Sequence, residues 1–291
     1  MKVAITGATG FIGRRLIDSL LAGGHEVCAL VRQTAALPSA VRVFRWDDPE
    51  EGLAGAAAVV HLAGELVSQR WTPEAKQRIR LSRIEGTRRL VEALSTVSDR
   101  PPALVCASAI GIYGSRGDET LTEASPAGQG FLPDVCTAWE AQADLADSLG
   151  MRVAKIRIGI VLGRGGGALA RMLPPFRAGL GGKLASGRQW MSWIHLDDLV
   201  RLIRFLIENP ISGPVNATAP HPVTNADFTR GLAVALHRPA LLPVPAVLLK
   251  LGFGEMAEIL LASQRVLPRA AESAGFRFEY PHLGVALASL L

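Results

Sequence analysis

An apolar run that meets evenly spaced glycines and then a helix pattern is the feature that most constrains the fold of this chain. Gly7, Gly10 and Gly13 have G-x-x-G-x-x-G spacing. They separate an expected strand, residues 2–6, from an expected helix, residues 11–22. Such a turn lets backbone approach a pyrophosphate, which then lies at a helix N-terminus where free N–H groups and the dipole favour negative charge. We interpret it as a dinucleotide-binding turn, the alternative being a turn that needs glycines for its own geometry.

Arg32 follows the second expected strand, residues 26–31. In dinucleotide-binding folds an acidic residue at this place bonds the ribose 2′-hydroxyl of NAD, whereas an arginine accommodates the 2′-phosphate of NADP. The arginine fork suits phosphate, and no carboxylate stands at this position to compete for it. The sequence therefore predicts NADP(H) as the cofactor. The alternative is an exposed arginine at the end of a strand.

Strand and helix patterns alternate along the first half of the chain. The segment AAAVVHLAG, residues 56–64, is apolar almost throughout, which is typical of a strand buried on both faces of a parallel sheet. Repeated strand–helix–strand units predict an α/β fold, a Rossmann-like doubly wound parallel sheet with a smaller C-terminal substrate lobe. The other expected elements are strands at 41–45, 103–108 and 152–163 and helices at 73–96, about 134–149 and 195–210.

The pattern changes after residue 165. The segment GRGGGALARMLPPFRAGLGGKLASG is rich in glycine and contains two prolines, so it predicts a mobile loop and a short helix. Short strands and helices are mixed in the remaining chain. We predict an NADP(H)-binding Rossmann-like domain over 1–165, to which 190–218 return, and a lobe over 166–291 that mainly forms the substrate pocket.

Composition and charge exclude several classes of function. The net charge is +5, but no block of Lys and Arg is interleaved with aromatics, so nucleic acid is not an expected partner. Neither a membrane-spanning run nor a signal-peptide pattern is present. Cys28, Cys106 and Cys136 lack metal-ligand spacing, and an odd number argues against a disulfide framework. We expect a cytoplasmic, metal-free protein with an unknown small-molecule substrate and no membrane partner; a homodimer is left open.

Several further motifs resemble those of one family. TGATGFIG, HLAGE at 61–65 and SAIGIYG at 108–114 are similar to motifs of the extended short-chain dehydrogenase/reductase family, and RIGIVLG at 157–163 and WIHLDDLV at 193–200 extend the similarity. Essentially the whole chain resembles its atypical "epimerase family protein" branch, also described as cell division inhibitor-like. The motifs that carry this closer resemblance are SRIEGTRRLVEAL, VCTAWEAQA, GRGGGAL and GEMAEILLASQRVLPRAAESAGFRFEYPHLGVAL.

The resemblance implies a Rossmann-like domain that holds NADP(H), with a substrate pocket under the C-terminal lobe. It implies that Leu62, Ala63 and Gly64 pass the adenosine and ribose side of the cofactor with their backbone, and that Ser108 stands where the family has its catalytic Ser or Thr. The other residues expected at the cofactor are Gly7, Thr9, Gly10, Phe11, Ile12, Gly13, Arg32, Arg83 and Cys136.

The catalytic pair of that family is missing. Family enzymes use Tyr-x-x-x-Lys on the helix after the fifth strand, where the lysine lowers the pKa of the tyrosine so that the phenol can move a proton. In FLPDVCTAWEAQA, Cys136 falls at the tyrosine position and Glu140 at the lysine position. Because a nearby negative charge raises the pKa of a thiol, Cys136 is more typical of a small buried hydrophobe than of a nucleophile. Glu140 is either a general base or a ligand of the ribose hydroxyls.

The predicted catalytic residues are Ser108, Tyr113 and Glu140. Tyr113 lies five residues after Ser108 and either projects toward the pocket or is a core tyrosine with a bonded hydroxyl. Arg83 stands where extended members commonly carry an asparagine. It either takes a phosphate or a substrate carboxylate at the cofactor edge, or lies on a solvated helix face.

Two classes of function follow. One is an NADP-dependent oxidoreductase or epimerase-like enzyme without the usual Tyr-x-x-x-Lys pair; the other is a non-catalytic NADPH-binding sensor or regulator. The glycine turn and Arg32 support cofactor binding under both. Ser108, Tyr113 and the pocket-forming lobe favour the enzyme, and the missing pair favours the sensor. A sugar-nucleotide epimerase proper is disfavoured, because the usual proton shuttle is absent.

Overall fold

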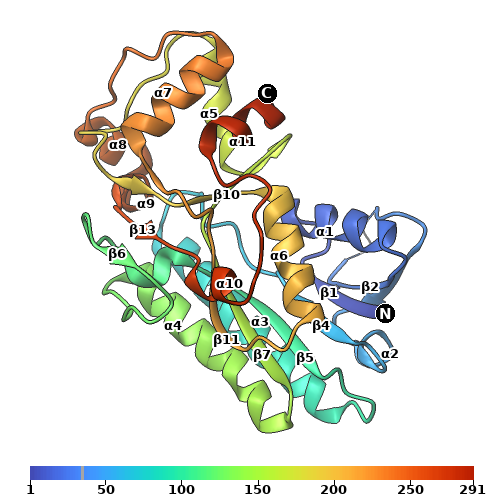
Figure 1. The fold of residues 1–291 in the computed structure, drawn as a ribbon. Coiled ribbons are helices and arrows are strands. Elements are labelled where there is room, and N and C mark those ends of the chain that lie inside the picture. The colour runs from blue at the N-terminus through green and yellow to red at the C-terminus, as the bar shows by residue number, and fades with distance from the viewer. Residues whose placement is uncertain (34–35) are drawn as a thin grey trace.

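The computed structural model describes residues 1–33 and 36–291 (Figure 1). Its strands are β1 Lys2–Thr6, β2 Glu26–Val31, β3 Val41–Arg45, β4 Ala58–His61, β5 Ala103–Ala109, β6 Thr120–Leu121, β7 Arg152–Ile158, β8 Ile160–Gly163, β9 Trp190–Met191, β10 Trp193–His195, β11 Gly213–Ala217, β12 Val223–Thr224 and β13 Arg265–Val266. Its α-helices are α1 Phe11–Ala22, α2 Glu50–Leu53, α3 Pro73–Thr96, α4 Phe131–Asp144, α5 Gly167–Arg177, α6 Leu196–Glu208, α7 Asn225–Leu236, α8 Ala246–Phe253, α9 Ala257–Leu261, α10 Arg269–Ser273 and α11 Leu283–Leu290. Three 3₁₀ helices complete the set, η1 Ile110–Tyr113, η2 Leu145–Leu149 and η3 Gly254–Met256.

Seven parallel strands form the central sheet in the order β11-β7-β5-β4-β1-β2-β3. Helix α1 packs beside α6, and α3 packs beside α4; the two pairs cover opposite faces of the sheet (Figure 1). This arrangement confirms the Rossmann-like doubly wound fold with a C-terminal lobe. The strand order reverses between β1 and β4, the place where ligands bind in such sheets.

Local sequence explains the central elements. Strands β1, β4 and β5 are almost entirely buried, which accounts for their apolar runs because both faces of the sheet are covered by helices. Helix α3 starts at Pro73 after Thr72, whose hydroxyl accepts a hydrogen bond from the Ala75 N–H and caps the helix. The expected helix over 73–96 is confirmed at both ends.

The expected strand over 152–163 is two strands in the structure. The chain turns at Gly159, where a β-carbon would lie 2.6 Å from the Ser192 carbonyl oxygen. Strand β7 stays in the central sheet, while β8 leaves it and pairs with β10 beside the C-terminal lobe. The helix expected over about 134–149 likewise begins earlier, at Phe131, and changes to the 3₁₀ helix η2 after Asp144.

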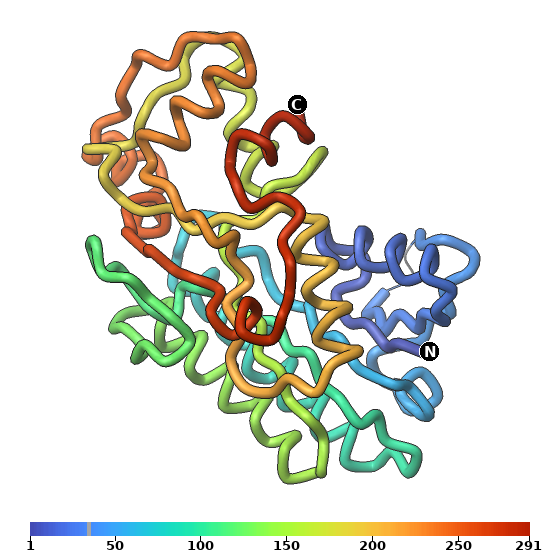
Figure 2. The backbone as a smooth tube through the Cα atoms, viewed as in Figure 1, coloured from blue at the N-terminus to red at the C-terminus, as the bar shows by residue number. Residues whose placement is uncertain are grey.

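Later segments run back to the sheet, as the tube in Figure 2 shows. Strand β11 pairs with β7 at the sheet edge, and α10 packs against β11. Strand β13 pairs with β6. Ala271 and Phe276 belong to the hydrophobic core that includes the central sheet. A second hydrophobic core lies around Trp193 and is formed in part by α5, α7 and α11. Among the described residues, no helix is long and apolar enough to cross a bilayer.

Candidate functional site

The carboxyl ends of the parallel strands meet at one edge, and the glycine turn lies at its centre. Gly7 follows β1 with φ +72°, a left-handed conformation that favours glycine. A β-carbon on Gly7 would lie 2.7 Å from the carbonyl carbon of Leu62 and 2.8 Å from the Ala63 nitrogen. The turn after β1 therefore packs directly against the backbone of the segment after β4, at the place where the strand order reverses.

The other two glycines have different structural roles. A β-carbon on Gly13 would lie 2.3 Å from the Gly7 carbonyl oxygen, so the third glycine permits close packing of helix against turn. Gly10 is exposed, has ordinary extended dihedral angles and is the N-cap of α1 without a side-chain cap. The first-turn N–H groups of α1 have no partners within the helix. They leave a donor-rich, positively polarised end open at the sheet edge.

Phe11 connects this helix end to the glycine-rich segment after β8. Its ring lies against Gly163, Gly166 and Gly167, where β-carbons would approach ring atoms to between 2.4 and 2.8 Å. Antiparallel bridges fold residues 162–167 into a tight hairpin over the ring. The sequence predicted a mobile loop here, but the glycines have a specific packing role that spacing alone did not reveal.

Arg32 is exposed just beyond β2, the neighbour of β1 in the sheet. No hydrogen bond or ion pair joins its guanidinium to another described residue. Parallel pairing of β1 with β2 places Arg32 at the same sheet edge as the glycine turn. An exposed cation thus lies at the same sheet edge as the helix end that favours anions.

Ser108, Glu140 and Arg157 form a buried polar cluster at the end of β5. Ser108 Oγ donates to Glu140 Oε1 at 2.7 Å. Arg157 on β7 holds both carboxylate oxygens, with Nε donating to Oε1 at 2.8 Å and Nη2 to Oε2 at 2.9 Å. All three residues are less than 10% exposed. Glu140, which the sequence analysis predicts at the family's lysine position, thus pairs with a cation on strand β7.

Tyr113 continues this cluster away from Ser108. Its side chain is fully buried, and its hydroxyl donates to Asn216 Oδ1 at 2.7 Å while accepting from Arg157 Nη1 at 2.9 Å. Asn216 Nδ2 donates to the Leu267 carbonyl. This is the environment of the core tyrosine, the second of the two interpretations of Tyr113. The hydroxyl orients Arg157 and ties the cluster to the C-terminal segment.

Cys136 and Arg83 lie next to one another on α4 and α3. Burial raises the pKa of the Cys136 thiol to about 12, and the nearby Arg83 charge only partly opposes this. The expected direction of the shift is correct, but burial contributes more than the Glu140 charge. The Arg83 guanidinium lies 5.1 Å from the centroid of the Trp139 ring and against Gly64. It is therefore not on a solvated helix face.

His61 joins the sheet edge to α3. Its Nδ1 is 2.6 Å from Thr6 Oγ1 and its Nε2 is 3.1 Å from Thr87 Oγ1. Thr6 Oγ1 also accepts from the Ala63 N–H. This role could not be predicted from the sequence, because a single histidine in an apolar strand has many explanations. The chain of bonds fixes the segment after β4 against the glycine turn.

We expect His61 to make folding stability depend on pH. Burial lowers the pKa of His61 to about 4, so the unfolded chain binds the extra proton first as the pH falls below the ordinary value of 6.5. Stability is therefore lost between pH 6.5 and about 4, and by about 2 kcal/mol between pH 6.5 and 5. Urea unfolding at several pH values measures this slope. His61→Gln should flatten it in that window, and an unchanged slope would show that His61 does not contribute.

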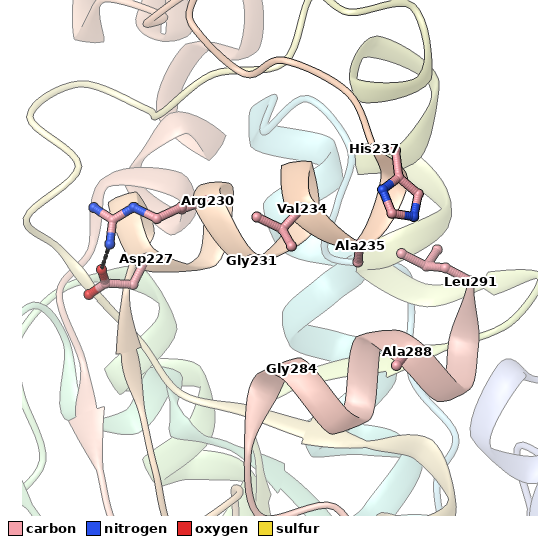
Figure 3. A pocket seen from close by; sticks show the side chains of 9 residues that line it. All are labelled: Asp227, Arg230, Gly231, Val234, Ala235, His237, Gly284, Ala288 and Leu291. Carbon is pink, nitrogen blue, oxygen red and sulfur yellow. Dashed lines mark hydrogen bonds and ion pairs between the residues drawn. The ribbon is translucent and has the colours of Figure 1, made fainter.

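One open groove lies away from the sheet edge, between α7 and α11 in the C-terminal lobe (Figure 3). Its volume is about 670 Å³, and it is largely apolar, with Val234 at its centre and His237 and Leu291 at one end. The two charged residues on its wall, Asp227 and Arg230, pair with each other. No residue predicted for the cofactor or for catalysis lines it.

Comparison with known proteins agrees with the fold. The NAD dependent epimerase/dehydratase family matches residues 3–218, and a domain of unknown function, DUF1731, matches residues 244–290. The chain belongs to the NAD-dependent epimerase/dehydratase family. The expected "epimerase family protein" branch, an atypical extended short-chain dehydrogenase/reductase type, is confirmed by the relatives.

The similarity to relatives and to a solved structure extends over the whole chain. The chloroplastic epimerase family protein SDR39U1 homolog of Arabidopsis thaliana is 43% identical, covering 100% of this chain and 87% of the relative. Epimerase family protein YfhF of Bacillus subtilis is 38% identical, covering 100% and 98%. The crystal structure of human epimerase family protein SDR39U1 (isoform 2) with NADPH is 34% identical, with a TM-score of 0.91 and coverage of 100% and 99%.

Proposed function

We propose that this protein binds NADP(H) at the edge where β1 and β4 meet and is an oxidoreductase on a small carbonyl or alcohol substrate. The observation that carries the cofactor assignment is Arg32, an exposed cation with no partner among the described residues, at the same sheet edge as an uncapped helix N-terminus. The similar human protein crystallised with NADPH supports the same assignment. The substrate would enter between this edge and the C-terminal lobe.

The residues of the edge suit each part of the cofactor. Gly7 and Gly13 keep the turn free of side chains, so the α1 N–H groups can reach the pyrophosphate. Arg32 would hold the 2′-phosphate with its fork. Leu62, Ala63 and Gly64 would present backbone to the adenosine and ribose side. The remaining contacts of the turn would come from Thr9, Gly10, Phe11 and Ile12.

Arg32→Asp should reverse the cofactor preference. The arginine fork on a phosphate contributes about 1.5–3 kcal/mol, and a carboxylate would instead repel the 2′-phosphate and accept a bond from the hydroxyl of NADH. We expect roughly a hundred-fold loss in NADPH affinity with NADH binding retained or improved. Calorimetric titration with both cofactors measures the change. Arg238→Asp, the same charge change at an exposed position in the C-terminal lobe, should alter neither; equal affinities in the wild type would contradict the assignment.

Ser108 and Glu140 provide a proton path that does not need the family's tyrosine. NADPH, when bound, would supply the hydride. Ser108 would hold the oxygen of the substrate at the end of β5, and its hydroxyl proton is already directed at Glu140 Oε1. In oxidation of an alcohol, Ser108 would give its proton to the Glu140 carboxylate as it takes the proton of the substrate hydroxyl. In reduction by NADPH, Glu140 would first take a proton from solvent, and the same protons would then move in the reverse direction to the substrate oxygen. Arg157 and Tyr113 would orient the carboxylate, and Cys136 would line the nicotinamide end as a neutral thiol.

Substitutions of Ser108 and Cys136 test this chemistry. We expect Ser108→Ala to lower kcat/KM roughly a hundred-fold, because removing the serine interrupts proton transfer. Cys136→Ala, also buried at the same edge, should cost less than about threefold, because its thiol stays protonated. Both are measured as NADPH oxidation with a panel of aldehydes, ketones and quinones. The reverse order of effects would make the thiol catalytic.

A non-catalytic NADPH-binding sensor is the second candidate. The observation that favours it is the Glu140–Arg157 pair, which occupies both carboxylate oxygens at the position where the family's lysine would serve the reaction. The substrate panel separates the two candidates. Tight NADPH binding without turnover of any carbonyl compound would support the sensor.

A further inference from the structure

Arg83 differs from Arg157, the other buried cation of the site, because only one of its three side-chain nitrogens donates a hydrogen bond to a described residue. Nη1 donates to the Glu65 carbonyl at 3.0 Å and to the Ile79 carbonyl at 3.1 Å. The guanidinium is fixed between the Trp139 ring and Gly64, where a β-carbon would lie 3.3 Å from both Cζ and Nη2. The absence of a side chain on Gly64 therefore lets the guanidinium lie close to the backbone there.

The other donors of Arg83, Nε and Nη2, have no hydrogen-bond partner among the described residues. Neither nitrogen is fully buried, unlike the Trp139 and Trp193 indole nitrogens, which are buried without a partner in the described part of the chain. No carboxylate there forms an ion pair with Arg83. The nearest acidic neighbour, Glu65, accepts instead from Gln69 and lies 4.0 Å from Arg78.

The positive charge of Arg83 costs free energy where it lies, because it is largely removed from water and no anion is paired with it. Burial lowers the pKa of Arg83, although an arginine stays charged at neutral pH. Cys136 beside it remains a neutral thiol and cannot compensate. A desolvated charge is costly unless it is paired. Arg157 shows the paired case in the same site, with both of its fork nitrogens on Glu140.

Arg83 lies at the same sheet edge as Ser108, where the reacting oxygen of the substrate is proposed to bind. Strands β4 and β5 pair in parallel, with His61 opposite Cys106, so Gly64 and Ser108 both lie just beyond this pair at the same edge. A ligand on the free edge of Arg83 would therefore lie at the same sheet edge as Ser108, where the substrate oxygen is placed.

We propose that Arg83 is the carboxylate-binding residue of the substrate site, and that the substrate is a carboxylic acid with its carbonyl or hydroxyl group close to the carboxylate. Nε and Nη2 form the side of the fork that pairs with the two oxygens of a carboxylate. A carboxylate monoanion would neutralise the single positive charge of Arg83, whereas a phosphate dianion would leave one excess negative charge in this partly buried position. The proposal rests on the function proposed above and names its substrate class.

Binding of small probes to the NADP⁺-loaded protein tests this directly. By calorimetry we expect oxamate and acetate to bind the wild type, and acetamide, the neutral isostere of acetate, not to bind. Arg83→Met should weaken oxamate binding about tenfold or more, because both fork bonds are lost. Arg80→Met, an exposed arginine on the same helix, should leave it unchanged.

Cofactor affinity provides the second readout. We expect the Kd for NADPH to stay within about threefold in Arg83→Met, which also shows that the variant is folded. If NADPH binding falls while oxamate binding persists, Arg83 serves the cofactor and the proposal is wrong. Preferential binding of inorganic phosphate, or no carboxylate binding to the wild type, would also overturn it. Failure of the general function would instead appear as loss of NADPH binding or turnover in the wild type.

Discussion

Gly10→Val is expected to weaken NADPH binding roughly a thousand-fold while the fold is retained, because two or three charge-assisted bonds to the pyrophosphate, together about 4 kcal/mol, would be blocked. The backbone of Gly10 has φ −75° and ψ 171°, which valine adopts readily. A β-carbon there would meet only the Gly7 carbonyl oxygen, at 3.2 Å. Valine therefore affects the open side of the turn, where the ligand would lie. Calorimetry measures the affinity, and circular dichroism and thermal melting measure the fold.

Gly13→Ala provides the contrast within the same turn. Its β-carbon would lie 2.3 Å from the Gly7 carbonyl oxygen and 2.9 Å from the Ala8 α-carbon, so the turn itself must move. This variant should lose thermal stability, whereas Gly10→Val should not. If Gly10→Val bound NADPH within a few-fold of the wild type, the glycines would serve only the geometry of the turn.

Arg157→Met is expected to lower the free energy of unfolding by about 3–5 kcal/mol, because it leaves the Glu140 carboxylate buried without its cation. Urea unfolding measures the loss. Lys155→Met is a matched control on the same strand: its ammonium lies 2.6 Å from Asp144, whose side chain is 43% exposed. The Lys155 side chain is 14% exposed, but because Asp144 is partly in solvent this pair should contribute less than about 1 kcal/mol.

The double variant Glu140→Gln with Arg157→Met isolates the cost of the unpaired charge. It should be more stable than Arg157→Met alone, because no uncompensated carboxylate remains in the core. If Arg157→Met costs no more than Lys155→Met, the buried pair does not stabilise the fold. The same variants report on the site, since Glu140 is the proposed end of the proton path from Ser108.

Local sequence patterns predict the central strands and helices of the Rossmann-like sheet, although not the division of residues 152–163 into β7 and β8. The apolar runs of β1, β4 and β5 predict a sheet covered on both faces, and the glycine spacing places a ligand-binding turn between β1 and α1. These are local signals, in which a residue's neighbours in sequence carry the information. The helix of residues 73–96 is a clear case, with a proline and a capping threonine at its start.

The partners of the polar side chains were decided only by the tertiary structure. Glu140 stands on a helix and Arg157 on a strand, and nothing in either segment indicates that they pair or that Tyr113 is bonded between Arg157 and Asn216. Likewise the sequence left Arg83 equally suited to solvent or to a ligand. The structure shows that Glu140 pairs with Arg157 and that Arg83 is largely buried rather than on a solvated helix face. A charge removed from water needs a specific partner, and packing of elements distant in sequence determines which groups surround it.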